Sequence, residues 1–266
     1  MNDRIVSYSG NEFGLRDQHN QTLLFLEMLD SHCKQHSITY SLAFGSMLGC
    51  VRSHGFIPWD DDVDIVMKRA DYNRFFESIK KHDTELSKKC DIYCPLYLNK
   101  LRYTVNDEGK QPITMYMDLF AADVVPQNFF LKKSKYYAIL FLKNVITARK
   151  GRLGKKYRLL RFIRKIIVYI ISFPFSVERL KGLYSRITLW GESNPSDKFT
   201  CYYSSHRSYG KYHKVELFNK VKYMPFEDIE LPVLEGYDEY LTTEFGDYMK
   251  LPPEKERHAF HTAGWE

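Results

Sequence analysis

The chain has 266 residues, with 44% apolar side chains, a formal charge of +6 and a pI near 8.9. This composition suits a globular protein with a full core, and five scattered cysteines, an odd number, imply no disulfide framework. No apolar signal region follows Met1, and the most apolar run, from Ile166 to Phe173, is far below the ~20 residues of a spanning helix. We therefore expect a cytoplasmic protein, with any membrane contact peripheral, at the inner face of the cytoplasmic membrane.

The first half of the chain alternates between helical and strand-like patterns. Helices are predicted over 15–36, 47–54 and 69–81, and strands over 38–44, 57–67, 90–98, 101–105 and 115–121. A Gly45-Ser46 turn separates the first strand from the second helix. Alternation of this kind predicts an α/β (α+β) fold, with a mixed β-sheet flanked by helices.

The second half has a different composition. Residues 129–193 are mostly helical in pattern and strongly basic between Lys143 and Lys165. A loop is expected at 194–197, strand-like pieces at 199–203 and 212–224, and a helix at 238–248. We therefore predict a single compact unit with three parts: a catalytic core at 1–128, a basic helical insertion at 129–198, and a C-terminal cap at 199–266 that completes the cleft.

An acidic run stands out in the predicted core. Four carboxylates lie within five positions, at Asp60, Asp61, Asp62 and Asp64. Alternation along Asp62-Val63-Asp64-Ile65 places Asp62 and Asp64 on one face of a strand. Clustered negative charge costs free energy unless cations neutralise it, and carboxylate oxygens suit Mg²⁺ or Mn²⁺. A solvated acidic loop is the alternative, but the apolar Val63 and Ile65 indicate a buried strand, where carboxylates need partners.

Two more features complete a pattern typical of phosphoryl transfer. Backbone N–H groups at a Gly45-Ser46 turn that opens a helix can hold a phosphate. Asp118 stands alone among apolar neighbours on another predicted strand, where it can supply a third metal ligand or accept the proton of an attacking hydroxyl. We predict that Asp62, Asp64 and Asp118 are both catalytic and metal-binding.

The region around these residues resembles the signature of the LicD family. The motif reads Gly45-Ser46-x-Leu48-Gly49-x-x-Arg52-x-x-Gly55-x-Ile57-Pro58-Trp59-Asp60-Asp61-Asp62-Val63-Asp64-Ile65. Further similarity at 100–102, 117–120 and 244–253 extends the resemblance to roughly residues 17–261, although 130–200 matches weakly. In one departure, many relatives have Gly-Gly before the helix, where this chain has Phe44-Gly45.

The LicD family includes bacterial phosphocholine transferases, is related to fukutin-related pentitol-phosphate transferases, and has a nucleotidyltransferase-type fold. The resemblance implies Mg²⁺-dependent transfer of phosphocholine, or a similar phospho-alcohol, from a CDP-linked donor such as CDP-choline. The acceptor would be a sugar hydroxyl of a cell-surface glycan such as lipopolysaccharide or teichoic acid. Asp62 and Asp64 would be the metal pair, Asp118 the third carboxylate and Gly45-Ser46 the phosphate turn. Nucleotidyl transfer with release of pyrophosphate, or a non-catalytic glycan-binding scaffold, are the open alternatives.

Cationic side chains are further candidates for substrate binding. Arg52 lies on the helix after the turn, where it could pair with a donor phosphate or tie the helix to the acidic loop. Lys100 and Arg102 share one face of a strand, so they could clamp the diphosphate or protect a sheet edge. His261 could also reach a phosphate, although lone histidines are more often structural or exposed.

Aromatic side chains could hold the head group of the alcohol. A choline head group is a quaternary ammonium, which binds best against aromatic faces. Trp59, Tyr116 and Tyr103 are the candidate walls, and core packing is the alternative for Trp59.

The basic segment at 149–167 interleaves cationic and apolar residues. This pattern suits contact with an anionic membrane, which fits an acceptor glycan that is linked to lipid. A solvated basic helix face is the alternative, and binding of nucleic acid is the least favoured interpretation.

Overall fold

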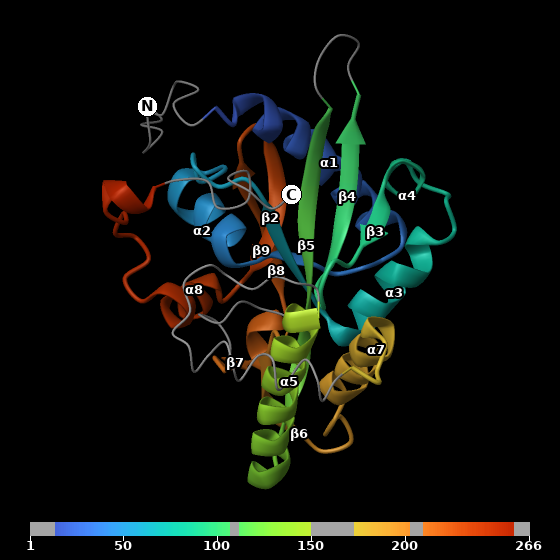
Figure 1. Cartoon of the computed structure of the whole chain (residues 1–266). Coiled ribbons are helices and arrows are strands. Elements are labelled where there is room, and N and C mark those ends of the chain that lie inside the picture. The colour runs from blue at the N-terminus through green and yellow to red at the C-terminus, as the bar shows by residue number, and fades with distance from the viewer. Residues whose placement is uncertain (1–13, 107–111, 150–172, 203–209, 258–266) are drawn as a thin grey trace. The chain divides into compact units, whose positions relative to one another are not determined.

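The computed structural model describes residues 14–106, 112–149, 173–202 and 210–257 (Figure 1). The chain divides into two compact units. The first comprises Met1–Tyr93, Asn99–Ala122 and His213–Glu266, and the second comprises Cys94–Leu98 and Asp123–Tyr212. The three-part division of the sequence, with boundaries after 128 and 198, stays a prediction.

The first unit is built on a mixed β-sheet with helices around it (Figure 1). Its elements are α1 (Arg16–Gln35), β1 (Ser41–Leu42), α2 (Phe44–Ser53), β2 (Val63–Lys68), α3 (Arg69–Ile79), α4 (Glu85–Lys89), β3 (Asp91–Tyr93), β4 (Asn99–Val105), β5 (Ile113–Pro126), β7 (His213–Lys214), η1 (Val215–Phe218), β8 (Val221–Phe226), β9 (Ile229–Leu234), α8 (Tyr237–Phe245) and η2 (Glu254–Glu256). Strand β5 continues beyond Ala122 into the second unit. The strand order is β1-β2-β5-β4-β3, with β2 and β5 parallel and the other neighbours antiparallel. The predicted fold class is confirmed.

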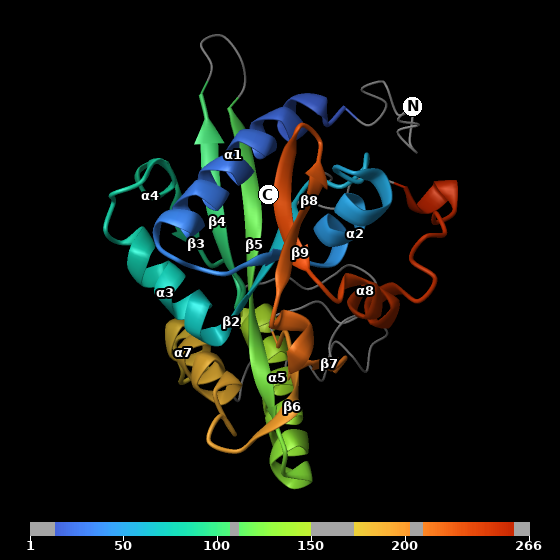
Figure 2. The same cartoon turned by 180° about the vertical axis from the view of Figure 1, so that it is seen from behind.

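Helix α1 covers one face of this sheet, as Figure 2 shows. Phe25, Leu26 and Leu29 of α1 are fully buried, and the Phe25 ring lies 5.4 Å from the ring of Tyr103 on β4. Side chains alternate along a strand, so Tyr103 points toward α1 while Lys100 belongs to the opposite face. The hypothesis that Tyr103 shares an aromatic wall with Tyr116 is therefore wrong, because Tyr116 pairs with Arg102 on that opposite face.

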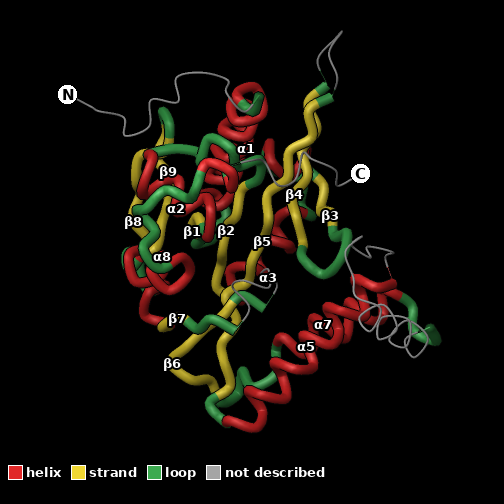
Figure 3. The backbone as a smooth tube through the Cα atoms, turned by 60° about the vertical axis from the view of Figure 1, so that its left-hand side comes forward, coloured by secondary structure: helices red, strands yellow, loops and turns green. Residues whose placement is uncertain are grey.

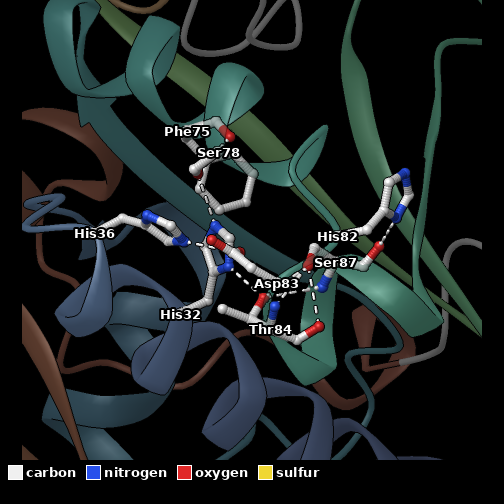
Figure 4. A network of polar contacts seen from close by, with 8 residues as sticks. All are labelled: His32, His36, Phe75, Ser78, His82, Asp83, Thr84 and Ser87. Atoms are coloured by element: carbon white, nitrogen blue, oxygen red, sulfur yellow. Dashed lines mark hydrogen bonds and ion pairs between the residues drawn. The ribbon is translucent and has the colours of Figure 1, made fainter.

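A buried polar network fastens α1 to α3 and α4 (Figure 4). The ring of His32 on α1 lies with Nδ1 2.6 Å from Thr84 Oγ1 and Nε2 2.8 Å from Ser78 Oγ. Thr84 also caps α4, since it forms a capping box with Ser87. Burial, together with the neighbouring His36, lowers the pKa of His32 to about 4. The His32 ring is therefore neutral near pH 7, where its hydrogen bonds satisfy both ring nitrogens.

The second unit contains the end of β5, β6 (Pro195–Thr200) and the helices α5 (Phe129–Arg149) and α7 (Val177–Thr188). Helices α5 and α7 pack against each other (Figure 3). Strand β6 runs antiparallel to β5, with Thr200 opposite Asp123. The helical character predicted for 129–193 is confirmed where that segment is described. The loop expected at 194–197 is wrong, because β6 already begins at Pro195 beside Pro126.

Two lysines of α5 lie in the core of the second unit. Lys135 Nζ donates hydrogen bonds to the carbonyl oxygens of Val124, at 3.3 Å, and Trp190, at 3.0 Å. Lys143 Nζ lies 5.1 Å from the centre of the Tyr97 ring, and burial lowers its pKa to about 7. Partners of this kind explain how α5 can carry cations on the side that it buries.

Other boundaries of the first unit differ from the sequence-based expectations. The strand expected at 38–44 is reduced to Ser41–Leu42, because α2 begins at Phe44. Residues 57–62 form a loop before β2, since the Pro58 corner is followed by three adjacent aspartates. Helix α4 was not predicted, because its five residues depend on the capping box at Thr84. Strand β9 was not predicted either, and it contains Pro232, which ordinarily argues against a strand.

Candidate active site

Three carboxylates meet on the sheet face that lies opposite α1. Asp64 of β2 pairs directly with Asp118 of the parallel strand β5, and Asp62 immediately precedes β2. One oxygen from each of the three side chains lies within 4.8 Å of the others. Neighbouring parallel strands thus bring together residues that are more than fifty positions apart in the sequence, as the pattern of carboxylates predicted.

The acidic loop adds more carboxylates and is held by α1. Oxygens of Asp60, Asp61 and Asp62 also lie within 4.8 Å of one another, so Asp62 belongs to both groups. Gln18 Nε2 donates to the carbonyl of Asp61 at 2.7 Å, and His19 Nε2 donates to the carbonyl of Asp60 at 2.7 Å. Sequence reasoning missed Gln18 and His19, because nothing in a helical pattern shows which distant backbone its polar side chains reach.

The Gly45-Ser46 turn lies against these carboxylates at the start of α2. Ser46 Oγ accepts a hydrogen bond from the backbone N–H of Asp64 at 2.8 Å. A Cβ atom on Gly45 would lie 2.7 Å from Asp60 Oδ2 and 3.9 Å from Asp64 Oδ2. Glycine therefore lets the helix approach the carboxylates without displacing the Asp60 side chain, and the N-terminus of α2 brings backbone N–H groups next to the cluster.

Phe44 precedes this turn in a left-handed backbone conformation, with φ of 41°. Such a conformation is strained for a bulky residue and is natural for glycine. The Phe44 ring is nevertheless buried, with its centre 4.9 Å from that of Phe120 and 6.0 Å from that of Tyr240. The departure from Gly-Gly thus replaces a flexible residue by one that is held in position by aromatic packing.

Lys100 supplies a cation to the cluster. It lies opposite Asp118 in the β4–β5 pair, with its Nζ 2.5 Å from Asp118 Oδ1. Tyr93 lies opposite Lys100 in turn, so one row across four strands carries Tyr93, Lys100, Asp118 and Asp64. The alternative that Lys100 and Arg102 protect a sheet edge is wrong, because β4 lies between β5 and β3. The phosphate clamp stays a prediction, and the partner of Lys100 here is a carboxylate of the candidate site.

Arg102 lies in the next row of the same face. It forms a bidentate salt bridge with Asp91 of β3, with Nε 2.9 Å from Oδ1 and Nη2 2.6 Å from Oδ2. Its guanidinium also lies 5.0 Å from the centre of the Tyr93 ring, and that ring is 5.9 Å from the ring of Tyr116. Arg102, Tyr93 and Tyr116 therefore lie on the same sheet face as Lys100 and Asp118.

The charges of the cluster shift the protonation of its members. Burial raises the pKa of Asp64 well above its ordinary value, and the nearby carboxylates of Asp62, Asp118 and Asp60 raise it further. Burial alone would lower the pKa of Lys100, but Asp118, Asp62 and Asp64 outweigh it and raise the pKa. The carboxylates thus hold Lys100 in its protonated form, whereas burial and the neighbouring carboxylates make ionisation of Asp64 costly.

Two comparisons relate this chain to known proteins. Residues 37–147 match the family model described as LicD/FKTN/FKRP, nucleotidyltransferase domain, and this range includes every carboxylate of the cluster. Over 258 residues the chain is 28% identical to the lipopolysaccharide cholinephosphotransferase LicD of Haemophilus influenzae, covering 93% of this chain and 96% of that protein. The chain is thus similar to the LicD family in its nucleotidyltransferase-domain region and to one LicD protein along most of its length. The resemblance seen in the sequence is therefore confirmed.

Two residues of the LicD signature are buried. Trp59 is 6% exposed, and the guanidinium of Arg257 lies 5.8 Å from the centre of its ring. Arg52 is 5% exposed, and its Nη1 donates to the carbonyl of Tyr248 at 3.1 Å, which ties α2 to the segment after α8. These contacts have a structural effect, and substrate binding by Trp59 or Arg52 stays a prediction.

Two further candidates lie outside the described residues. These are His261 and nearly all of the basic segment at 149–167, of which Arg149 alone is described. Arg149 Nη2 donates to the carbonyl of Phe175 at 3.4 Å. No helix in the described part of the chain is long and apolar enough to cross a bilayer.

Proposed function

We propose that the chain transfers phosphocholine, or a similar phospho-alcohol, from a CDP-linked donor to a sugar hydroxyl of a cell-surface glycan. The convergence of Asp62, Asp64 and Asp118 beside the N-terminus of α2 carries this proposal. The match to the LicD family model supports a transferase, and the name of the relative from H. influenzae supports phosphocholine and lipopolysaccharide as the first substrates to test. Teichoic acid is a further acceptor to test.

The carboxylate cluster suits a divalent cation. Magnesium and manganese prefer carboxylate and phosphate oxygens, and three oxygens within 4.8 Å of one another can share one ion. Burial and then repulsion from Asp62, Asp118 and Asp60 raise the pKa of Asp64, and a bound cation would offset both costs. We infer that Asp62, Asp64 and Asp118 would hold Mg²⁺ or Mn²⁺, which when bound would stabilise negative charge on the donor diphosphate.

The side chains of the protein would perform the remaining steps. Asp118 would accept the proton of the sugar hydroxyl, whose oxygen attacks the phosphorus of the phospho-alcohol. The anhydride bond to CMP then breaks, and CMP leaves with the bonding electron pair. Lys100, held beside Asp118, would neutralise charge on the diphosphate, and the backbone N–H groups at the start of α2 would orient it.

A panel of CDP-alcohols tests this function. The purified chain is incubated with Mg²⁺, an acceptor glycan, and CDP-choline, CDP-ethanolamine, CDP-glycerol or CDP-ribitol, and release of CMP is measured. We expect release that depends on both the metal and the acceptor. Asp62→Asn and Asp64→Asn should keep the fold and lower the rate by about 1,000-fold or more. The matched control is Glu77→Gln, which changes an exposed carboxylate on α3. Turnover retained in either aspartate variant would overturn the assignment.

The same assay separates the alternatives. A nucleotidyltransferase would attack the α-phosphate of CTP and release pyrophosphate, so CTP replaces the CDP-alcohol in a parallel reaction. A glycan-binding scaffold would bind the acceptor but release neither product. Pyrophosphate without CMP would favour the first alternative, and binding without any turnover would favour the second.

A further inference from the structure

The charges of this chain are strongly segregated along the sequence. Residues 124–177 contain 13 Lys and Arg side chains and no Asp or Glu. The chain has 39 basic and 33 acidic side chains in all, so the rest of it has 26 basic and 33 acidic ones and is net negative. The positive charge of the protein therefore belongs to one stretch, and α5 is its described part.

Helix α5 exposes four aromatic side chains. Its exposed residues are Phe129, Phe130, Lys133, Ser134, Tyr137 and Phe141. Phe130 is 78% exposed, Tyr137 61% and Phe141 52%. The spacing of these three residues, i, i+7 and i+11, places them in one stripe along the helix. We call the four exposed aromatic residues the α5 aromatic face. A helix of a globular protein normally buries such a stripe, so this face is suited to a partner outside the chain.

The opposite side of α5 already has its packing partners. The buried residues Ile139, Leu142 and Ile146 lie on that side, and α5 packs against α7 within the same unit. More apolar side chains are exposed nearby in the sequence, at Phe173 and Phe175, just before α7 begins. The second unit therefore has a filled core and, in addition, an aromatic surface that it does not use for folding.

We propose that the α5 aromatic face binds an anionic lipid bilayer and lies in its headgroup region. Aromatic side chains favour this boundary, and cations beside them attract anionic lipid. Lys133 provides such a cation, because it is exposed and its Nζ lies 4.7 Å from the centre of the Phe129 ring, and residues 124–177 contain no carboxylate. A protein partner is disfavoured, because a stable apolar interface seldom carries so large an unopposed positive charge. The helix would lie along the surface, because it is not apolar enough to span the bilayer.

This inference is separate from the chemistry at Asp62, Asp64 and Asp118. If the acceptor glycan is linked to lipid, membrane binding raises the local concentration of acceptor without changing the active site. Turnover of a soluble acceptor should then be unaffected by loss of the α5 aromatic face. Failure of the inference and failure of the proposed function would thus give different results.

Vesicle sedimentation tests the inference. The full chain is mixed with vesicles of phosphatidylcholine alone, or with vesicles in which about a third of the lipid is phosphatidylglycerol. We expect binding to the anionic vesicles only, weakened at least tenfold in the triple variant Phe130→Ser, Tyr137→Ser, Phe141→Ser. The rescue variant Phe130→Trp, Tyr137→Trp, Phe141→Trp should bind at least as well as the unchanged chain, because Trp favours the interface.

Two controls make the test specific. The control variant Leu24→Ser, Met249→Ser removes two apolar side chains of the first unit that are about as exposed as Phe141, and it should bind normally. A single Phe141→Trp variant should show a blue shift in fluorescence on binding and quenching by brominated lipid. Equal vesicle binding by the triple serine variant would overturn the proposal. A change from dimer to monomer in that variant, with lipid binding unchanged, would also overturn it and would indicate contact with a second copy.

Discussion

Lys100 and Asp118 face each other across strands β4 and β5, with Nζ of the lysine 2.5 Å from Oδ1 of the aspartate. This ion pair places the positive charge of Lys100 on β4 next to the carboxylates of β2 and β5. The cation partly offsets the repulsion among Asp62, Asp64 and Asp118, so it helps the acidic face to form before any substrate binds. The same ammonium is placed where charge would develop on a bound diphosphate.

Replacement of Lys100 by alanine should therefore separate catalysis from metal binding. We expect Lys100→Ala to lower kcat by about 100-fold, since a charge aimed at the transition state is lost. Affinity for Mn²⁺ should stay the same or rise, because the carboxylates lose a competing cation. CMP release and calorimetric titration with Mn²⁺ measure the two effects. The control Lys80→Ala removes an exposed lysine that pairs with Glu77. Unchanged kcat in Lys100→Ala would show that the lysine is only structural.

Asp64→Asn should stabilise the protein in the absence of metal while it abolishes transfer. Burial and like charges raise the pKa of Asp64 in the folded state. Folding therefore favours the protonated form, and that contribution to stability is lost as the pH rises through the folded-state pKa. Asparagine does not ionise, so it avoids this loss. We expect the free energy of unfolding to rise by about 1 kcal/mol near pH 7 and to depend less on pH. Thermal unfolding in EDTA across pH measures both. A lower melting temperature for Asp64→Asn in EDTA would contradict this account.

His32 predicts a pH dependence of the opposite sign. Its pKa falls from 6.5 to about 4 in the folded protein, so the unfolded chain binds the proton more readily. The stabilising contribution is complete above pH 6.5 and is lost as the pH falls toward 4, and it reaches at most about 3 kcal/mol. Urea unfolding at several pH values should show this loss, and His32→Gln should show a smaller slope over the same range. Equal slopes in the two proteins would rule out His32 as the source.

Gly45→Ala should damage the active site more than the fold. The added Cβ would lie 2.7 Å from Asp60 Oδ2, which is the movable end of a side chain, so Asp60 can turn away. We expect at least a tenfold loss of transfer and a change in stability below about 1 kcal/mol. Gly182→Ala is the matched control, because nothing lies within 4 Å of that position in α7. It should stabilise the chain by about 0.5–1 kcal/mol and leave transfer unchanged.

Substitutions at Phe44 should reverse the usual order of alanine and glycine in a helix. Both Phe44→Ala and Phe44→Gly lose the packing against Phe120 and Tyr240, which costs about 3 kcal/mol. Glycine also relieves the positive φ of 41°, so Phe44→Gly should be more stable than Phe44→Ala by about 1 kcal/mol. Chemical denaturation of the two variants measures this difference. An alanine variant that is more stable than the glycine variant would show that the backbone at Phe44 is not strained.

Part of the site could be read from local pattern. Alternation along Asp62-Val63-Asp64-Ile65 is a property of any strand, so the shared face of Asp62 and Asp64 follows from the sequence. The lone carboxylate of Asp118 between apolar neighbours marked it in the same way. Long helical stretches such as α1 and α3 were predicted within two residues, because their buried positions repeat at helical spacing.

Other features depended on contacts between distant segments. The pairing of Lys100 with Asp118 depends on the register of β4 and β5, and the support of the acidic loop by Gln18 and His19 depends on where α1 crosses the sheet. No short window of sequence contains either relation. The same holds for Tyr103, which shares a strand with Lys100 but faces α1.

By itself, the sequence determined which side chains of this protein can do chemistry, because the identity and alternation of the carboxylates are local and covalent. It also determined the segregation of positive charge into residues 124–177. Only the tertiary structure decided which oxygens lie within 4.8 Å of one another, which cation stands beside them, and which aromatic side chains of α5 stay exposed. Those outcomes arise from strand register and from packing between segments far apart in the chain, which local propensity does not specify.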